Sequence, residues 1–325
     1  MRRREFIGLF TALASAALIG SSQPGCGQAP LPTVAVLRAT GAESTRVNLM
    51  FREALRSIGH EDGRTIRLME YAANNDLGQL ATLSASVRDS GPTVVVAMGP
   101  AAARAIKAAS PAIPIVAFTS FPVEAGLAAS LVRPGGNVTG VSLITTELDP
   151  KRLSLLAEYV PSAKRIAILR DRAVPANHTP ELEATARTLG LTLDVVEVER
   201  PDDIGPAINL AKSRGAEALN VLASPMLNGS ASNVAASARK AGLPAMCQWR
   251  EMAEAGCLIS YGPSFMEGYR LAAAQMDRVL RGANPAELPI QQPTRFELIV
   301  NLTAARALRL DLASTLLARA DEVIE

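Results

Sequence analysis

The stretch VVVAMGPAAARAI, residues 94–106, contains the transition that defines the fold. An unbroken apolar run reaches Gly99-Pro100, and small residues at helical spacing follow. This pattern is typical of a buried parallel strand that leads into a helix. The first N–H groups of such a helix have no partner within the helix, so the junction is a place where a ligand can bind.

The same alternation extends along the chain in both directions. In the first half we predict strands at 33–40, 65–73, 92–99 and 113–118, and helices at 47–60, 77–90 and 100–110. In the second half the order repeats, with strands at 165–172, 191–199, 218–224 and 243–249 and helices at 180–190, 204–215 and 229–242. Short connections between alternating strands and helices give right-handed parallel βαβ units. The fold class is therefore α/β, with two doubly wound parallel-sheet lobes.

Three segments link the two halves: 136–152, 256–264 and 289–301. Between the last two we predict an amphipathic helix over 264–282, with an apolar stripe of Tyr269, Leu271, Ala272, Met276, Val279 and Leu280. Three crossings form a three-segment hinge, and the carboxyl ends of both sheets then face a cleft. We assign 31–141 and 262–290 to an N-terminal lobe, and 142–261 and 291–325 to a C-terminal lobe.

Residues 1–26 have the pattern of an export signal. A basic start is followed by an apolar run that is too short to span a membrane as a helix. Arg3-Arg4 with the apolar pair after Glu5 fits the twin-arginine pattern, and an ordinary secretory signal is the alternative. Lipid attachment at Cys26 stays open, although the residues before it suit lipidation poorly. We expect an exported, periplasmic protein.

Charge and composition argue against a nucleic-acid partner. The chain has 33 basic and 31 acidic residues, and residues 1–26 hold three arginines and one glutamate, which leaves 30 of each sign. A neutral chain offers no basic stripe, and 4% aromatic residues do not suit a base-stacking platform. No later run is apolar enough to cross a bilayer.

No motif for catalysis or for a metal is found. The chain lacks GxSxG, HExxH, P-loop and GxGxxG patterns, and His60 and His178 have no partners at ligand spacing. We predict no enzyme activity, no cofactor and no metal site. For Cys247 and Cys257 we favour two buried free thiols over the disulfide that an oxidising compartment would permit.

Several motifs together resemble one family. They are RRREFIG (2–8), IPIV (113–116), LVRPGGNVTGVS (131–142), YGP (261–263), QQPTRFELIVNLTAARALRL (291–310) and LLARADEVIE (316–325). They are similar to the ABC-transporter substrate-binding family, whose studied members include aromatic amino-acid binders. The resemblance implies a type I periplasmic binding protein fold and a monomer that captures a small solute for a membrane ABC permease, without chemistry. A periplasmic sensor that docks on a membrane signalling receptor is the alternative.

The resemblance also implies where the ligand binds, namely at loops that follow the strands of both lobes. The candidate residues are Arg38, Thr40, Gly99, Pro100, Ala101, Thr119, Ser120, Phe121, Gly140, Val141, Ser142, Asp171, Ser224, Met226, Tyr261 and Gly262. Two positions depart from the family pattern. Pro100 stands where a hydroxyl residue is common, and Phe121 stands where an acidic residue is common.

Structural interpretations remain open for several of these residues. Gly99-Pro100 can shape a tight turn, and Ser224 can cap a helix. Tyr261 can be a core aromatic, and Phe121 can lie under its own loop. Asp171 can be solvated or can pair with a neighbouring arginine, Arg170 or Arg172.

The expected ligand is a small organic solute with a carboxylate and an apolar body, an amino acid or a relative. Helix starts after Gly99 and near Ser224 favour an anion, and the hydroxyls of Thr119, Ser120 and Ser142 add donors. Because Phe121 replaces an acid, we expect the amino group to be recognised less strictly. We expect the lobes to close as rigid bodies, with bending near residues 140–145, 260–263 and 291–296.

Overall fold

The computed structural model describes residues 30–39, 45–74, 76–143, 146–174 and 179–325. The chain divides into residues 1–30, of which only Pro30 is described, and one unit over Leu31–Glu325. The predicted signal, Cys26, Thr40 and His178 lie outside the described residues. Everything below concerns the second unit.

The first sheet has five parallel strands in the order β2-β1-β3-β4-β5. They are β1 (Thr33–Arg38), β2 (Arg67–Ala72), β3 (Val94–Met98), β4 (Ile115–Thr119) and β5 (Val138–Ser142). β1 and β3 are fully apolar in the middle because both faces of the sheet are covered by helices.

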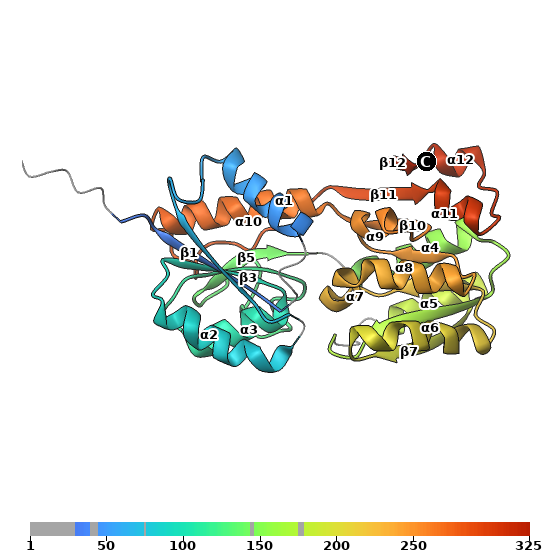
Figure 1. Ribbon diagram of the computed structural model, residues 1–325, viewed down its shortest axis with the longest axis horizontal. Coiled ribbons are helices and arrows are strands. Elements are labelled where there is room, and N and C mark those ends of the chain that lie inside the picture. Colours follow the sequence, from blue (N-terminus) through green and yellow to red (C-terminus); the bar gives the residue numbers. More distant parts are fainter. Residues whose placement is uncertain (1–29, 40–44, 75, 144–145, 175–178) are drawn as a thin grey trace, which may run out of the picture. The chain divides into compact units, whose positions relative to one another are not determined.

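Alternate strand residues pack against different helices. Val34 and Val36 face the cluster that includes Phe51 of α1 (Thr45–Ser57) and Tyr269 of α10 (Phe265–Leu280). The residues between them, such as Ala35, pack with α2 (Leu80–Asp89) and α3 (Pro100–Ala109). Figure 1 shows α1 and α10 on one side of this sheet and α2 and α3 on the other.

The second sheet has seven strands in the order β12-β11-β10-β9-β8-β6-β7. They are β6 (Arg165–Asp171), β7 (Thr192–Val198), β8 (Ala218–Val221), β9 (Ala245–Cys247), β10 (Ile259–Pro263), β11 (Phe296–Asn301) and β12 (Glu322–Ile324). One face packs on α4 (Asp149–Tyr159), α5 (Thr179–Leu189), α11 (Leu302–Ala307) and α12 (Ser314–Leu317). The other packs on α6 (Ile204–Ser213), α7 (Pro225–Gly229), α8 (Ala231–Lys240) and α9 (Arg250–Glu254). Short 3-10 turns occupy Leu77–Gln79, Thr146–Leu148 and Pro201–Asp203.

The second sheet is not entirely parallel, although the alternating βαβ pattern predicts a parallel sheet. β11 runs antiparallel to β10, with Pro263 opposite Phe296 and Ile259 opposite Val300. The chain leaves the second sheet at the carboxyl end of β10, and after α10 it re-enters at that same end. The next strand must therefore run in the opposite direction.

The chain passes between the two sheets three times, as the sequence predicts. It leaves β5 for α4, leaves β10 for α10, and returns from α10 to β11. On the way back Gln291 lies beside β5, where its N–H donates to the Gly140 carbonyl and its carbonyl accepts from the Ser142 N–H. The crossings therefore begin and end within a few residues of one another.

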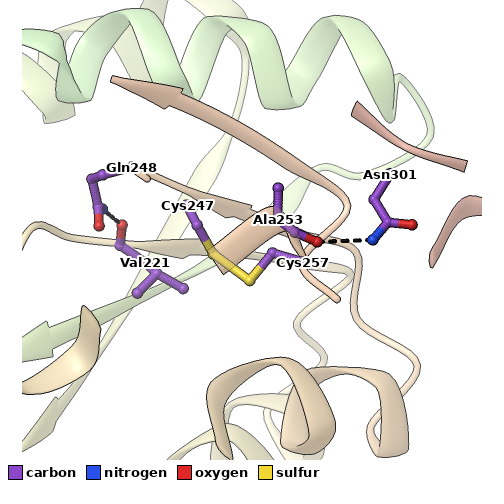
Figure 2. The surroundings of a disulfide bond; sticks show 6 residues. All are labelled: Val221, Cys247, Gln248, Ala253, Cys257 and Asn301. Carbon is purple, nitrogen blue, oxygen red and sulfur yellow. Dashed lines mark hydrogen bonds between the residues drawn. A yellow bond between two sulfur atoms is a disulfide. The ribbon is translucent and has the colours of Figure 1, made fainter. Parts of the chain in front are cut away.

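Cys247 and Cys257 form a disulfide, so the expectation of two free thiols is wrong. Both residues are fully buried, as that expectation required, but the segment between them turns back through α9 and brings the two Cα atoms within 6.6 Å. This separation suits a disulfide. Figure 2 shows the bond beside two further ties: Asn301 donates to the Ala253 carbonyl at 2.8 Å, and Gln248 donates to the Val221 carbonyl.

Candidate functional site

A cavity of about 220 Å³ lies at the carboxyl ends of strands from both sheets. The first sheet contributes the end of β3, the start of α3 and the loop after β4. The second sheet contributes the loops after β6, β8 and β9, and the start of α10 closes one side. This is the edge at which open α/β sheets bind ligands.

Aromatic side chains form the main wall of the cavity. The chain has seven Phe, four Tyr and one Trp, and five of these twelve side chains line this cavity. The ring of Trp249 stacks on Phe265 with centroids 4.2 Å apart, and Phe118 stacks on Tyr269 at 4.5 Å. Aromatic residues are therefore scarce in the chain but concentrated here, which suits a flat apolar ligand.

Phe121, the fifth aromatic residue, has a backbone conformation that side chains rarely adopt. Its φ angle is +57°, in the left-handed region. Non-glycine residues in this region are strained by roughly 1–2 kcal/mol and are enriched at ligand sites. The strained turn places Phe121 on the cavity wall, so the interpretation in which it lies only under its own loop is not what the structure shows.

Gly99 and Pro100 lie at the cavity, at the junction predicted from the sequence. Gly99 has a φ angle of +92°, and its N–H donates to the Phe118 carbonyl at 2.8 Å. Pro100 is the first residue of α3, where it loses no helical hydrogen bond. An added Cβ on Gly99 would lie 3.7 Å from the Pro225 ring, so this junction contacts the loop after β8.

Thr119 and Ser120 also line the cavity, at the end of β4. The Thr119 hydroxyl donates to the Ser120 carbonyl at 3.0 Å, and the Thr119 carbonyl accepts from the Leu143 N–H. The Thr119 hydroxyl proton is therefore already engaged in the loop, and its oxygen is the part of it that remains to interact with a ligand.

Ser224 lines the cavity, and Asp171 supports it from behind. The Ser224 hydroxyl caps α7 by accepting from the Leu227 N–H, and it donates to one Asp171 oxygen at 2.5 Å. The other Asp171 oxygen accepts from the Ala173 N–H at 2.8 Å. Asp171 is thus a buried link between the loops after β6 and β8, and no arginine of the described residues pairs with it.

Gly140, Val141 and Ser142 of β5 are placed inside the protein and not on the cavity wall. A Cβ on Gly140 would lie 2.0 Å from the Ala117 carbonyl oxygen, so glycine is required by the neighbouring strand. Val141 belongs to the apolar core, and the Ser142 N–H binds the Gln291 carbonyl.

The remaining candidates lie away from this cavity. Arg38 is buried at the end of β1 and pairs with Glu70 at 3.3 Å, and burial lowers its pKa. Tyr261 stacks on Phe296 and packs, partly buried, against the core of the second sheet. Ala101, Met226 and Gly262 are described but do not line it either, and Gly262 lies at a separate hollow near α1 and α9.

That separate hollow is larger, at about 370 Å³, but is a weaker candidate. Its rim carries carboxylates from Glu53 of α1, Glu251 of α9 and Glu297 of β11, and Phe265 is the one aromatic residue among its described lining residues. It includes residues that follow β9 and β10 but none from the ends of β3 and β4, so we place the site at the aromatic cavity.

Four aromatic side chains of the site were not among the predicted residues: Phe118, Trp249, Phe265 and Tyr269. Tyr269 was predicted on the apolar stripe of its helix, and it is indeed 2% exposed; burial raises the pKa of its hydroxyl. Phe118 and Trp249 each end an apolar run next to a loop, and this position is a usable signal. Two charged side chains, Arg104 and Glu124, were also missed.

Within the described residues there is no group of three or more His, Cys, Asp or Glu side chains that could hold a metal. Among the helices of the described part of the chain, none is long and apolar enough to span a bilayer.

Comparison with known proteins gives consistent matches over most of the chain. Residues 40–324 match the family model described as ABC transporter substrate binding protein. A tyrosine-binding protein of Clostridioides difficile (strain R20291) is 26% identical over 263 residues, which cover 79% of this chain and 75% of the relative.

Solved structures of similar proteins agree with this family assignment. An ABC domain from Streptococcus pneumoniae in complex with L-Trp superposes with a TM-score of 0.83 at 23% identity, covering 90% of this chain and 100% of the other. A ligand-free, open substrate-binding protein from Clostridium difficile gives 0.64 at 21% identity, covering 91% and 99%. These structures confirm the type I periplasmic binding protein fold that the resemblance implied.

Proposed function

Because the chain belongs to the ABC transporter substrate-binding protein family, we propose that it is an exported receptor for a small carboxylate with an aromatic body. It would act as a monomer that delivers the ligand to a membrane ABC permease. The aromatic cavity is the observation that carries this proposal. Two similar proteins, a tyrosine-binding protein and an ABC domain solved in complex with L-Trp, support an aromatic amino acid as the ligand.

The start of α3 supports the carboxylate. Gly99 and Pro100 line the cavity at the positive end of the helix dipole, which favours an anion there. The second predicted helix start contributes less, because α7 begins with Pro225 and Ser224 already binds the Leu227 N–H. The anion is therefore expected near the first sheet.

The lone tryptophan of the chain, Trp249, allows a direct binding assay. It lines the cavity and stacks on Phe265, so a ligand that enters should change its fluorescence. L-phenylalanine is a suitable probe because it does not absorb where tryptophan is excited, and calorimetry covers L-tyrosine and L-tryptophan. We expect saturable binding of these amino acids and none of glucose.

Two comparisons of ligands test the ligand class, and one variant tests the optical signal. Equal affinity for L-phenylalanine and its amide would refute carboxylate recognition. Tight binding of a neutral sugar would refute the class altogether. Replacement of Trp249 by Phe keeps an aromatic ring on the wall, so calorimetric binding should weaken but persist while the optical signal disappears.

We also propose that closure of two lobes captures the ligand. The lobes are residues 31–141 with 262–290, and 142–261 with 291–325, and bending is assigned to 140–145, 260–263 and 291–296. The support is the close grouping of the three crossings, which leaves few residues to absorb a rotation. Solution scattering should show compaction with saturating L-phenylalanine, and an unchanged radius would refute closure.

Export is proposed from residues 1–26, by the twin-arginine or the general secretory route, with lipidation at Cys26 open. The Cys247–Cys257 disulfide supports an oxidising compartment such as the periplasm. Cell fractionation with mass spectrometry of the mature protein would test the route, the cleavage and the lipid together.

A further inference from the structure

The aromatic cavity carries one side chain of each charge. Among the described residues that line it, Arg104 and Glu124 are the two charged ones. Both are exposed, and in the described part of the chain neither shares an ion pair with the other or with a further residue. The cavity therefore presents a separate cation and anion next to its aromatic wall.

Arg104 is the fifth of the ten residues of α3, just beyond its first turn. The positive end of the helix dipole is at Gly99 and Pro100, which line the same cavity as Arg104. α3 also has no acidic residue in its first turn that would offset the charge. The positive potentials of the dipole and the guanidinium add at the cavity, and an anionic group of a ligand would relieve both.

Glu124 lies in the turn after β4, which is tied to the same helix. Within the turn the Ala125 N–H donates to the Phe121 carbonyl at 2.9 Å. Lys107, one helical turn beyond Arg104, donates to the Gly126 carbonyl at 2.6 Å and to the Leu127 carbonyl at 3.0 Å. These bonds hold the backbone that carries Glu124 beside the helix that carries Arg104.

We propose, on the basis of the function proposed above, that Arg104 binds the carboxylate and Glu124 the ammonium group of an α-amino acid. The cavity then selects zwitterions, whose two charges sit on one carbon next to the apolar side chain. Glu124 supplies the counter-charge that the sequence seemed to lack at Phe121. The expectation that the amino group is recognised loosely is replaced by strict recognition.

Three probes with one ring and different charges test the assignment. L-phenylalanine has both charges, phenylpropanoate lacks the ammonium, and phenethylamine lacks the carboxylate. Trp249 fluorescence and calorimetry give the affinities for wild type, Glu124→Gln and Arg104→Gln. The controls Glu287→Gln and Arg239→Gln remove exposed charges that do not line the cavity.

We expect Glu124→Gln to lower the affinity for L-phenylalanine about tenfold, because the charge-assisted hydrogen bond to its ammonium group is lost. The affinity for phenylpropanoate, which has no ammonium group, should stay within about twofold of wild type. Arg104→Gln should weaken both acids about tenfold, and the two controls should change nothing. Thermal melts should be unchanged for all variants because every substituted side chain is exposed.

Two results would overturn the assignment in different ways. If phenylpropanoate binds wild type as tightly as L-phenylalanine and Glu124→Gln has no effect, the zwitterion assignment is wrong while aromatic carboxylate binding stands. If no aromatic probe binds wild type, the proposed function fails and the assignment fails with it.

Discussion

Replacement of both Cys247 and Cys257 by alanine tests how firmly the Trp249 segment is held. The disulfide joins residues ten positions apart. A cross-link over a loop of this length lowers the conformational entropy of the unfolded chain, which raises the free energy of that chain by about 2.7 kcal/mol at 25 °C. Alanine is preferred to serine because both sites are fully buried, and a hydroxyl there would need a partner. With the small voids left by the sulfur atoms, we expect the free energy of unfolding to fall by about 3 kcal/mol.

The assay is urea unfolding of wild type and the double variant, followed by Trp249 fluorescence and far-ultraviolet circular dichroism. Trp249 lies between the two cysteines in sequence, so its signal reports the cross-linked segment itself. The midpoint should move to lower urea with an unchanged slope. Affinity for L-phenylalanine should also fall several-fold, because binding must then order the segment. A loss below about 1 kcal/mol would refute the chain-entropy reasoning.

Three further variants test single features of the fold and site. Gly140→Ala should destabilise by about 3 kcal/mol or more in thermal melts, because its Cβ would meet the Ala117 carbonyl oxygen at 2.0 Å. Arg152→Met should cost about 3–5 kcal/mol in chemical denaturation, because it removes the guanidinium that pairs with buried Asp149 at 2.7 Å. Phe121→Asn should lower L-phenylalanine affinity about tenfold in calorimetry, while stability changes by less than about 1 kcal/mol because relief of backbone strain offsets lost packing.

Matched substitutions separate these effects from general damage. Gly136→Ala should be neutral, because nothing lies within 4 Å of the added carbon. Arg152→Lys keeps the charge and should cost less than Arg152→Met. A Gly140→Ala melt within about 2 °C of wild type, an Arg152→Met loss below about 1 kcal/mol, or unchanged ligand affinity in Phe121→Asn would each contradict its argument.

Most strands and helices could be predicted because local pattern and burial agree. The 94–106 stretch contains β3 and α3 almost residue for residue, since a strand covered on both faces must be apolar throughout. The helix α4 was missed within a segment interpreted as a linker, and β12 is too short to show a period. The direction of β11 depends on the end at which the chain re-enters the second sheet, and no local sequence pattern predicts that end.

The candidate site could be predicted mainly on one side, with Ser224 as the predicted residue that lines it from the second sheet. Gly99, Pro100, Thr119, Ser120 and Phe121 follow strands of the first sheet, and all of them line the cavity. The opposite wall depends on contacts between aromatic side chains that come from elements far apart in the sequence. Trp249 and Phe265 come from different sides of a chain crossing, and their stacking is a tertiary fact that spacing along the sequence does not contain.

The order in which the helices and strands are synthesised determines when the core of the first sheet can be completed. α10 packs on β3, β4, β5 and α1, yet it follows the whole run from β6 to β10. One face of the first sheet, on which α1 also packs, therefore lacks its second helix until more than 260 residues have been made. Contacts so distant in sequence form slowly. The first sheet therefore completes its core only after strands β6 to β10 of the second sheet have been made.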